Sequence, residues 1–264
     1  MSRQKSRSIG RFLKADGYRA FGDIRFPVSC LLVFLCWYVN ARRFRTSEDL
    51  IGIYVNTWGR SIVTLLDMVI AAFPFATAVC EDRRDRMLRY SVLRGSVPAY
   101  TGSKLAICFF SSFAAIFIGI NGFVLKEMIS YTAVAPNSIT AVNFSVVPFG
   151  GLLKSHPLLF IELQTALDSL LCAAYSCLAL ALSIKSRYSY GTYVMPFIFY
   201  YILFEEIPGQ IPWYLTFREC FELLTFPVEI QVWPGIIVCV AALTTFAILF
   251  ISYRLMIGWV RKCL

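Results

Sequence analysis

Cys80-Glu81-Asp82-Arg83-Arg84-Asp85-Arg86-Met87-Leu88-Arg89-Tyr90-Ser91-Val92-Leu93-Arg94 is a dense island of charge between two long apolar runs, and the rest of the chain is organised around it. Its apolar side chains recur at helical spacing, with Met87 and Leu88 one turn before Ser91 and Val92, and this predicts a helix over 81–94. Acidic residues at its start and arginines at its end complement the dipole of such a helix. Gly95 and Pro98 are expected to end it. We therefore expect a short polar helix between two membrane spans.

The composition of the chain excludes a soluble domain. Hydrophobic residues make up 58% of the 264 residues and charged residues only 16%, and a protein of this size could not keep such a surface in water. Several apolar runs reach the length of about 20 residues that crosses a hydrocarbon core about 30 Å thick. We therefore expect an all-α, polytopic membrane protein with one transmembrane domain over 1–264.

Six apolar runs are predicted to cross the membrane, at 26–40, 61–80, 104–125, 158–183, 189–204 and 235–253. Residues 1–25 are basic and carry apolar residues at helical spacing, which is typical either of an amphipathic helix in the headgroup region or of a disordered basic tail. Residues 205–234 are too apolar for a free loop and too rich in proline for a span. They are predicted to form short re-entrant helices in the outer leaflet.

The distribution of basic residues predicts the orientation of the chain. If the N-terminus is inside, 18 of the 25 lysines and arginines lie in cytoplasmic segments and 7 lie outside, so both termini and the helix over 81–94 are expected in the cytoplasm. The net charge of +9 is then explained by topology and by contact with anionic membrane lipids. No long basic patch is interleaved with stacking aromatics, so nucleic acid is not an expected partner.

Motifs that carry enzymatic chemistry are absent from the sequence. It contains no GxxxxGK[ST] loop, no HExxH pair and no GxSxG turn, and its single histidine is His156. Phosphate cradling, metal-assisted hydrolysis and serine catalysis therefore lack their residues, and we expect a chain that is not an enzyme and holds neither a cofactor nor a metal. The cysteines lie mostly in apolar runs, where packing is the expected role and a disulfide is not.

Two ionisable residues, Asp67 and Asp168, are predicted to lie at membrane depth in the second and fourth spans. A charge in hydrocarbon costs several kcal/mol, so such residues usually face the interior of a bundle or water. One interpretation is a polar substrate path or a proton relay at both residues. The other is that each carboxyl is hydrogen-bonded to neighbours such as Thr64, Thr165 or Ser169.

The order of these features resembles the membrane subunit of a type-2 ABC transporter. The resemblance consists of the basic segment before the first span, the acid-led helix Glu81 to Leu93, the sequence Gly95-Ser96-Val97-Pro98-Ala99-Tyr100 leading to Lys104, Pro196 in the fifth span, and the apolar segment 205–234. It implies six spans per subunit and a dimer with a second permease subunit, identical or a sibling, in a bacterial plasma membrane. It also implies a separate cytoplasmic ATPase dimer that binds ATP and Mg and accepts the helix over 81–94.

The resemblance assigns two sets of residues. The first set would couple the chain to the ATPase and consists of Glu81, Asp82, Arg83, Asp85, Arg86, Met87 and Arg89. The second would line a substrate path and consists of Trp37, Tyr38, Asp67, Asp168 and Phe197. The expected function is export of an amphiphilic substrate such as a peptide antibiotic, a drug or a lipid-like molecule. The alternative is a proton-coupled secondary transporter that uses Asp67 and Asp168.

Overall fold

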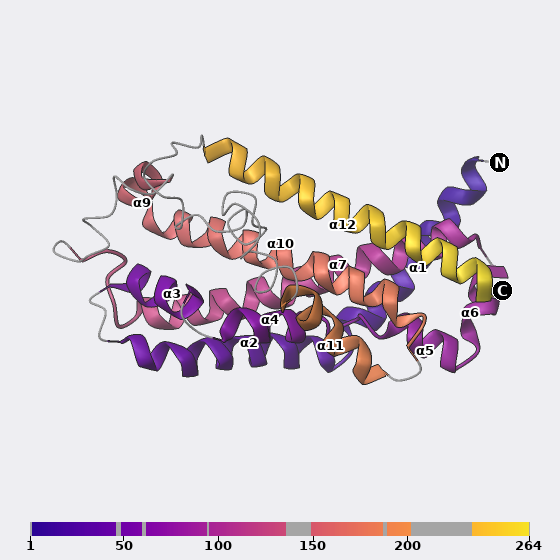
Figure 1. The fold of residues 1–264 in the computed structure, drawn as a ribbon, viewed down its shortest axis with the longest axis horizontal. Helices are drawn as coiled ribbons and strands as arrows, with labels where there is room; N and C mark the ends of the chain where they lie inside the picture. Colours follow the sequence, from indigo (N-terminus) through magenta and orange to yellow (C-terminus); the bar gives the residue numbers. More distant parts are fainter. Residues whose placement is uncertain are drawn as a thin grey trace.

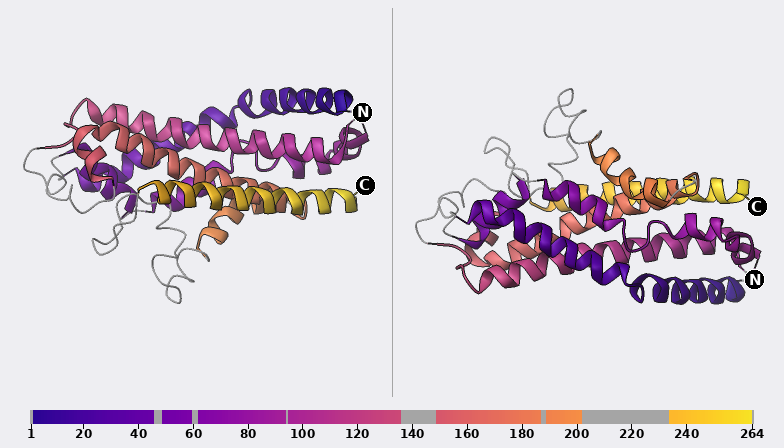
Figure 2. Two further views of the ribbon diagram at one scale, coloured as in Figure 1. Left: turned by 90° about the horizontal axis from the view of Figure 1, so that it is seen from above. Right: turned by 90° about the horizontal axis from the view of Figure 1, so that it is seen from below.

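The protein is an elongated bundle of helices in which the long elements follow one axis (Figures 1 and 2). The computed structural model describes residues 2–45, 49–59, 62–93, 95–135, 149–186, 189–201 and 234–263. Within these residues the elements are helices and turns without a strand, so the prediction of an all-α fold is confirmed for this part of the chain. The helices are α1 (Ser2–Phe21), α2 (Arg25–Ala41), the 3-10 helix η1 (Arg42–Phe44), α3 (Leu50–Gly59), α4 (Val63–Ala71), α5 (Ala78–Arg84), α6 (Met87–Leu93), α7 (Val97–Met128), α9 (Gly150–Ser155), α10 (Pro157–Ser183), α11 (Ser189–Tyr201) and α12 (Pro234–Cys263).

The structure contains several helices that could cross a membrane. Helices α7, α10 and the part of α12 from Val238 to Cys263 are each long and apolar enough to cross a membrane. Ile9–Phe21 and Arg25–Phe44 are long and apolar enough when taken together, although a bend of 51° separates them. The described ranges thus hold three candidate spans, or four if the bent pair is one span. Both ends of the chain lie at the same end of the bundle, beside α5 and α6 (Figure 1).

The second predicted span, 61–80, is not one helix. Helix α4 ends at Ala71, an irregular turn follows over 72–77, and α5 begins at Ala78. Pro74 lies inside this turn, and a proline has no backbone N–H and disfavours helical geometry in the residue before it. The hydroxyl of Ser112, on α7, donates to the carbonyl oxygen of Ala71 at 2.6 Å. A neighbouring helix therefore satisfies a backbone group where α4 ends.

The predicted helix over 81–94 is likewise two short helices, α5 and α6, joined by a turn at Asp85 and Arg86. Arg86 has a φ of +59°, a left-handed conformation that a continuous helix cannot contain. The turn lets Leu88 and Val92 of α6 enter the same apolar cluster as Val79 of α5. Burial of these side chains favours the break over a straight helix that would leave them in solvent.

Pro98 begins a helix, whereas the sequence analysis expected it to end one. Ser96 is extended, and its hydroxyl accepts a hydrogen bond from the backbone N–H of Ala99 at 3.3 Å, with Pro98 in the first turn of α7. Serine is a favoured N-cap, and proline is tolerated in the first turn because its missing N–H would have no partner there. Helix α7 therefore begins before the predicted span at 104.

Helix α3 was not predicted and lies in the expected connection between the first two spans. The Asp49 carboxylate accepts from the backbone N–H of Gly52 at 2.8 Å, which caps the start of the helix. Leu50, Ile53 and Tyr54 are buried against the bundle. The predicted re-entrant segment 205–234 falls almost wholly outside the described residues, as do 202–204 at the end of the predicted fifth span.

The helices enclose two apolar clusters. The first surrounds Trp37, Tyr54 and Phe123, and the second surrounds Phe75, Tyr100 and Met256. Helix α10 packs against α7, α11 and α12, and α1 packs along α7. These contacts bring residues far apart in the sequence together at two polar sites.

Candidate functional site

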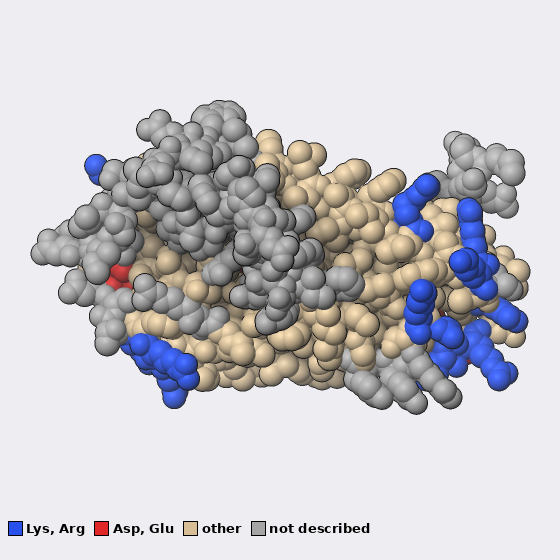
Figure 3. Space-filling model, viewed as in Figure 1, with Lys and Arg blue, Asp and Glu red and all other residues tan. Residues whose placement is uncertain are grey.

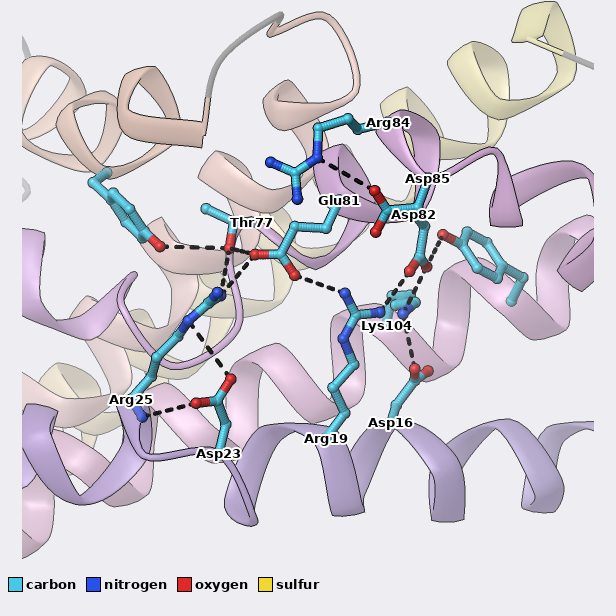
Figure 4. A network of polar contacts seen from close by, with 12 residues as sticks. Asp16, Arg19, Asp23, Arg25, Thr77, Glu81, Asp82, Arg84, Asp85 and Lys104 are labelled. Carbon is cyan, nitrogen blue, oxygen red and sulfur yellow. Dashed lines mark hydrogen bonds and ion pairs between the residues drawn. The ribbon is translucent and has the colours of Figure 1, made fainter.

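The first polar site lies where α5 meets α1, α2 and α7 (Figure 4). Helix α5 begins directly after the 72–77 turn, and the hydroxyl of Thr77 donates to the Glu81 carboxylate at 2.9 Å. This places Glu81 and Asp82 on the side of α5 that faces the basic residues of α1. Asp82 is buried and Glu81 is half-buried.

Glu81 joins α5 to the bend between α1 and α2. Its Oε2 accepts from Arg19 Nη2 at 2.7 Å, and its Oε1 accepts from Arg25 Nη1 at 2.7 Å. Arg25 also lies 3.6 Å from the Asp23 carboxylate, and Asp23 accepts from the backbone N–H of Arg25 at 3.1 Å. The carboxylate of Glu81 is therefore shared by a cation from each of the two helices.

Asp82 joins α5 to α7 as well as to α1. Its Oδ1 accepts from Arg19 Nη1 at 2.5 Å, and its Oδ2 lies 2.8 Å from both the Tyr100 hydroxyl and the Lys104 ammonium. Lys104, almost fully buried, also lies 2.8 Å from the carboxylate of Asp16 on α1. We call Asp16, Arg19, Arg25, Glu81, Asp82 and Lys104 the ion-pair network; three carboxylates meet three cations in it.

The network favours the ionised carboxylates. Burial raises the pKa of Glu81, but hydrogen bonds from Arg25, Arg19 and Thr77 outweigh it and hold the pKa below the usual 4.5. Burial also raises the pKa of Asp82, and the charges and hydrogen bonds of Lys104 and Arg19 lower it below 3.8. Both groups are therefore anions at neutral pH.

The outward side of α5 and α6 forms a second surface at the same end. Met87 is 57% exposed, Tyr90 64% and Leu93 81%. We call Arg84, Arg86, Met87, Arg89, Tyr90 and Leu93 the tip surface, because all six are exposed. A hollow of about 710 Å³ opens between this surface and Cys263 at the end of α12. Basic side chains gather at this end of the molecule (Figure 3).

The seven predicted coupling residues therefore divide between two environments. Glu81 and Asp82 face inward to the ion-pair network, and Arg83, although exposed, donates to the carbonyl oxygen of Ile184. The remaining four, Asp85, Arg86, Met87 and Arg89, are exposed. Sequence reasoning missed Tyr90 and Leu93, although their spacing of three from Met87 and from each other marks the face of α6 opposite Leu88 and Val92.

The second polar site lies within the bundle, between α2, α3, α4 and α10. Trp37 Nε1 donates to Asp67 Oδ2 at 2.8 Å. Gln164 Nε2 donates to Asp168 Oδ1 at 3.0 Å, and the Tyr54 hydroxyl lies 3.5 Å from Asp168 Oδ2. Both aspartates are buried. In the part of the chain that the structure describes, Oδ1 of Asp67 has no hydrogen-bond partner.

Both aspartates are hydrogen-bonded, as one interpretation expected, but the partners described are Trp37, Gln164 and Tyr54 and not the expected hydroxyls. Thr64 donates to the carbonyl oxygen of Trp58, and Ser169 to that of Thr165, so neither hydroxyl hydrogen is used by an aspartate. Thr165 instead shares a hydrogen bond of 3.1 Å with the Tyr54 hydroxyl. Tyr54 was not a predicted site residue because it lies on α3, the helix that the sequence analysis missed.

The five residues predicted to line a substrate path are not all together. Trp37 and Asp67 are in direct contact, and Asp168 on α10 lies beside Tyr54, whose ring centre is 5.1 Å from that of Trp37. Tyr38 lies at the far end of α2 beside Arg42, Arg45 and Lys126. Phe197 is half-buried on α11. Across the described ranges, no group of three or more His, Cys, Asp or Glu side chains is placed to hold a metal ion.

Comparison with models of protein families, with curated proteins and with solved structures found no match for this chain. The arrangement that bears on function is therefore the geometry of the two polar sites and of the tip surface. The fold and its candidate spans agree with a membrane protein. The tip surface presents exposed apolar side chains beside arginines, and the site between Asp67 and Asp168 presents polar groups within the bundle.

Proposed function

We propose that the chain is the permease subunit of a transporter powered by a separate ATPase in the cytoplasm, like the type-2 ABC transporters that its sequence resembles. The observation that supports this proposal is the direct connection between the tip surface and the candidate spans. Helix α5 carries exposed side chains on one side, while on the other Glu81 and Asp82 hold α1, α2 and α7.

The tip surface has the composition of a protein contact. Methionine, tyrosine and arginine are enriched in protein interfaces, where apolar side chains with polar surroundings supply most of the affinity. Met87, Tyr90 and Leu93 are exposed beside three arginines. They precede the start of the candidate span α7 at Val97. A soluble ATPase that binds this surface would cover apolar area that otherwise faces water.

The ion-pair network would transmit movement of the tip to the membrane. Its bonds are short, and Asp16, Asp82 and Lys104 are shielded from solvent, so separating the charges is costly. A displacement of α5 by the ATPase would therefore move the adjoining ends of α1, α2 and α7 with it. In a dimer of such subunits, this movement would open and close a path between them.

The remaining parts of the proposal follow the same scheme. Each subunit has six spans, both termini are in the cytoplasm, and α1 lies at the inner surface of a bacterial plasma membrane. The second permease subunit is identical or a sibling, and the partner ATPase holds the ATP and Mg. The transported molecule is an amphiphile such as a peptide antibiotic, a drug or a lipid-like molecule, which the apolar bundle would accept.

The coupling proposal can be tested by ATP hydrolysis in material purified from the native host. The tagged permease is expected to carry Mg-dependent ATPase activity from a subunit with a GxxxxGK[ST] loop. Replacing Met87 and Tyr90 by Asp places two charges in the contact and is expected to reduce the co-purified activity about ten-fold or more. Lys154→Glu, at an exposed position of α9 at the other end, is the matched control and should retain it. Retention by the double variant, or no ATPase at all, would contradict the proposal.

A second candidate function, a proton-coupled transporter, is favoured by one observation. Asp67 is buried, and its Oδ1 has no partner among the described residues. A carboxyl in such a place is a candidate to carry a proton across the bundle. Proteoliposomes containing the purified chain, without ATP, should then take up protons when a gradient is imposed and a transported amphiphile, such as a peptide antibiotic, is supplied. Asp67→Asn should abolish that flux, and Glu162→Gln, an exposed acid on α10, should not. Uptake of the amphiphile that requires ATP and not the gradient, or a proton flux that Asp67→Asn leaves unchanged, excludes this candidate.

A further inference from the structure

A group of cations surrounds one tyrosine at the end of the bundle opposite the tip surface. The Lys126 ammonium lies 4.6 Å from the centre of the Tyr38 ring, and the guanidinium carbons of Arg42 and Arg45 each lie 5.1 Å from it. Arg42 and Arg45 follow the end of α2, and Lys126 belongs to the last turn of α7. We call Tyr38, Arg42, Arg45, Lys126 and Glu127 the Tyr38 cluster.

The positive charge of this cluster is only partly neutralised. Glu127, which is fully buried, contacts Arg45 at 3.0 Å and Lys126 at 2.7 Å, and both cations use the same oxygen, Oε1. Among the residues with described side chains, Arg42 has no ion pair. Three cations and one carboxylate therefore leave an excess of two positive charges. The contacts with the neutral Tyr38 ring do not change this charge count.

The excess charge is placed where an anion can reach it. Arg42 is exposed, and the side chains of Arg45 and Lys126 are 32% and 35% exposed. Lysine and arginine side chains lie at the two ends of the molecule, and the wall between the ends shows few of either charge in this view (Figure 3). The cluster lies at the end of Arg25–Phe44, the second helical part of the bent pair, and in the last turn of the candidate span Val97–Met128, with Arg45 directly after Phe44. This is the depth at which the phosphates of lipid headgroups meet the ends of membrane helices.

The side chains also match the chemistry of phosphate. A guanidinium offers a planar fork of donors to two phosphate oxygens, an ammonium adds a compact charge, and a phenol adds one donor. Arg42 and Arg45 come from η1 and its end, and Lys126 from α7, so donors from two elements converge on one place. Arg42, Arg45 and Lys126 repel one another, and Glu127 offsets only part of this repulsion, so a further anion would be attracted to them.

We propose that Arg42, Arg45 and Lys126, arranged around Tyr38, bind a phosphate-bearing anion. The phosphate is supplied either by an anionic lipid in the leaflet at this end or by a soluble phosphate ester. The binding site does not depend on how the chain is powered, and it stands apart from the proposed function. The site also explains why basic residues lie at this end of the bundle, where the positive-inside rule predicts few of them.

The test measures binding to the purified full chain in two arms. In the lipid arm, nanodiscs contain phosphatidylcholine alone or with phosphatidylglycerol, and native mass spectrometry counts retained phosphatidylglycerol. In the soluble arm, glycerol phosphate is titrated onto the protein in a neutral detergent by calorimetry. Saturable binding in the first arm identifies a lipid phosphate as the ligand, and saturable binding in the second arm identifies a soluble ester. Either result, or both, supports the site if the variants described next weaken that binding.

The variants are Arg42→Gln, Lys126→Gln and the matched control Arg43→Gln. Arg43 is exposed and adjacent in sequence, but it is not one of the cations over the Tyr38 ring. Arg42→Gln and Lys126→Gln are each expected to weaken binding about ten-fold, because each removes a charged hydrogen-bond donor, and Arg43→Gln less than about two-fold. Arg42 is exposed and outside the pairing with Glu127, so its variant is expected to fold. Binding in neither arm, or equal binding by Arg42→Gln and Arg43→Gln, overturns the proposal.

Discussion

Arg19 and Lys104 each contact two carboxylates of the ion-pair network, so the charge state of those carboxylates sets a large part of the local stability. Glu81 and Asp82 have pKa values below 4.5 and 3.8, because the surrounding cations outweigh the effect of burial. Between the lowered pKa of each group in the folded chain and its ordinary pKa, the unfolded chain binds more protons than the folded one. The stabilisation is therefore complete above the ordinary pKa values and is lost as the pH falls through the lower folded values.

The lowered pKa values of Glu81 and Asp82 predict how the stability of the protein responds to acid. Between about pH 7 and pH 5 the network should contribute a constant stabilisation, and its contribution should fall steadily below about pH 4. Thermal unfolding in detergent, followed by circular dichroism from about pH 7 to pH 3, measures the effect. Glu81→Gln with Asp82→Asn should destabilise the protein by about 3 kcal/mol at neutral pH, because cations are left without their partners, and should flatten the acid response.

Asp85, an acid on the surface of the protein, provides the control for the prediction about acid stability. Asp85 is exposed and pairs only with the exposed Arg84, at 3.3 Å, among the described side chains. Such pairs contribute about 0–1 kcal/mol, so Asp85→Asn should keep both the stability and the acid response. If the Glu81 and Asp82 variant keeps the full acid response, the network does not control it.

At the scale of elements, Gly119 fixes how closely α7 approaches α2. A Cβ at this position would lie 2.6 Å from Val33 Cβ and 2.9 Å from the carbonyl oxygen of Cys30. One of these atoms belongs to the backbone of α2, so the helices must move apart to admit a methyl group. Small residues at such contacts let membrane helices pack closely.

Gly119→Ala is therefore expected to destabilise the protein by about 1–3 kcal/mol. Gly102→Ala is the matched control on the same helix, because no atom lies within 4 Å of its Cβ position. It should leave stability unchanged or raise it by about 0.5–1 kcal/mol through the better helix propensity of alanine. Melting temperatures of both variants in one detergent decide the point, and equal values would mean that α2 and α7 are not held together at Gly119.

The elements differ in how far the sequence could predict them. Helices α7, α10 and α12 follow from long apolar runs, since length and hydropathy alone specify a span. Helix α3 has a local signal in the sequence, because Asp49 stands as an N-cap before the apolar run Leu50-Ile51. The break at Arg86 has no such local signal, because it depends on burying Leu88 and Val92 against other helices.

The sites show the same division between local and long-range information. The charge island at 81–94 is visible in the sequence, but its separation into inward and outward faces is not. Arg19 and Glu81 are 62 residues apart, and Trp37 and Asp67 are 30 apart. Spacing within one helix cannot predict such pairs, because tertiary packing decides which helices become neighbours. Trp37 and Tyr38 are adjacent in sequence, but tertiary packing brings Trp37 against Asp67 and Tyr38 against Arg42, Arg45 and Lys126.

At the scale of the whole molecule, the two ends treat charge differently. At the end with α5 and α6, buried cations meet buried carboxylates and the surplus arginines face outward on the tip surface. At the other end, the Tyr38 cluster keeps an excess of positive charge over the described carboxylate. An ATPase contact and an anion site would therefore be on opposite sides of the membrane, with the apolar length of the bundle between them.

This arrangement leads to a prediction about orientation. Arg84 on α5 and Lys154 on α9 are both exposed and lie near opposite ends of the bundle. In a background with all nine native cysteines replaced by serine, Arg84→Cys should react with a membrane-impermeant maleimide only after the cells are opened. Lys154→Cys should react in intact cells, because the distribution of basic residues predicts that α9 lies outside. Reaction of both from one side would mean that the bundle does not cross the membrane, and reaction of Arg84→Cys from outside would remove the tip surface from any cytoplasmic ATPase.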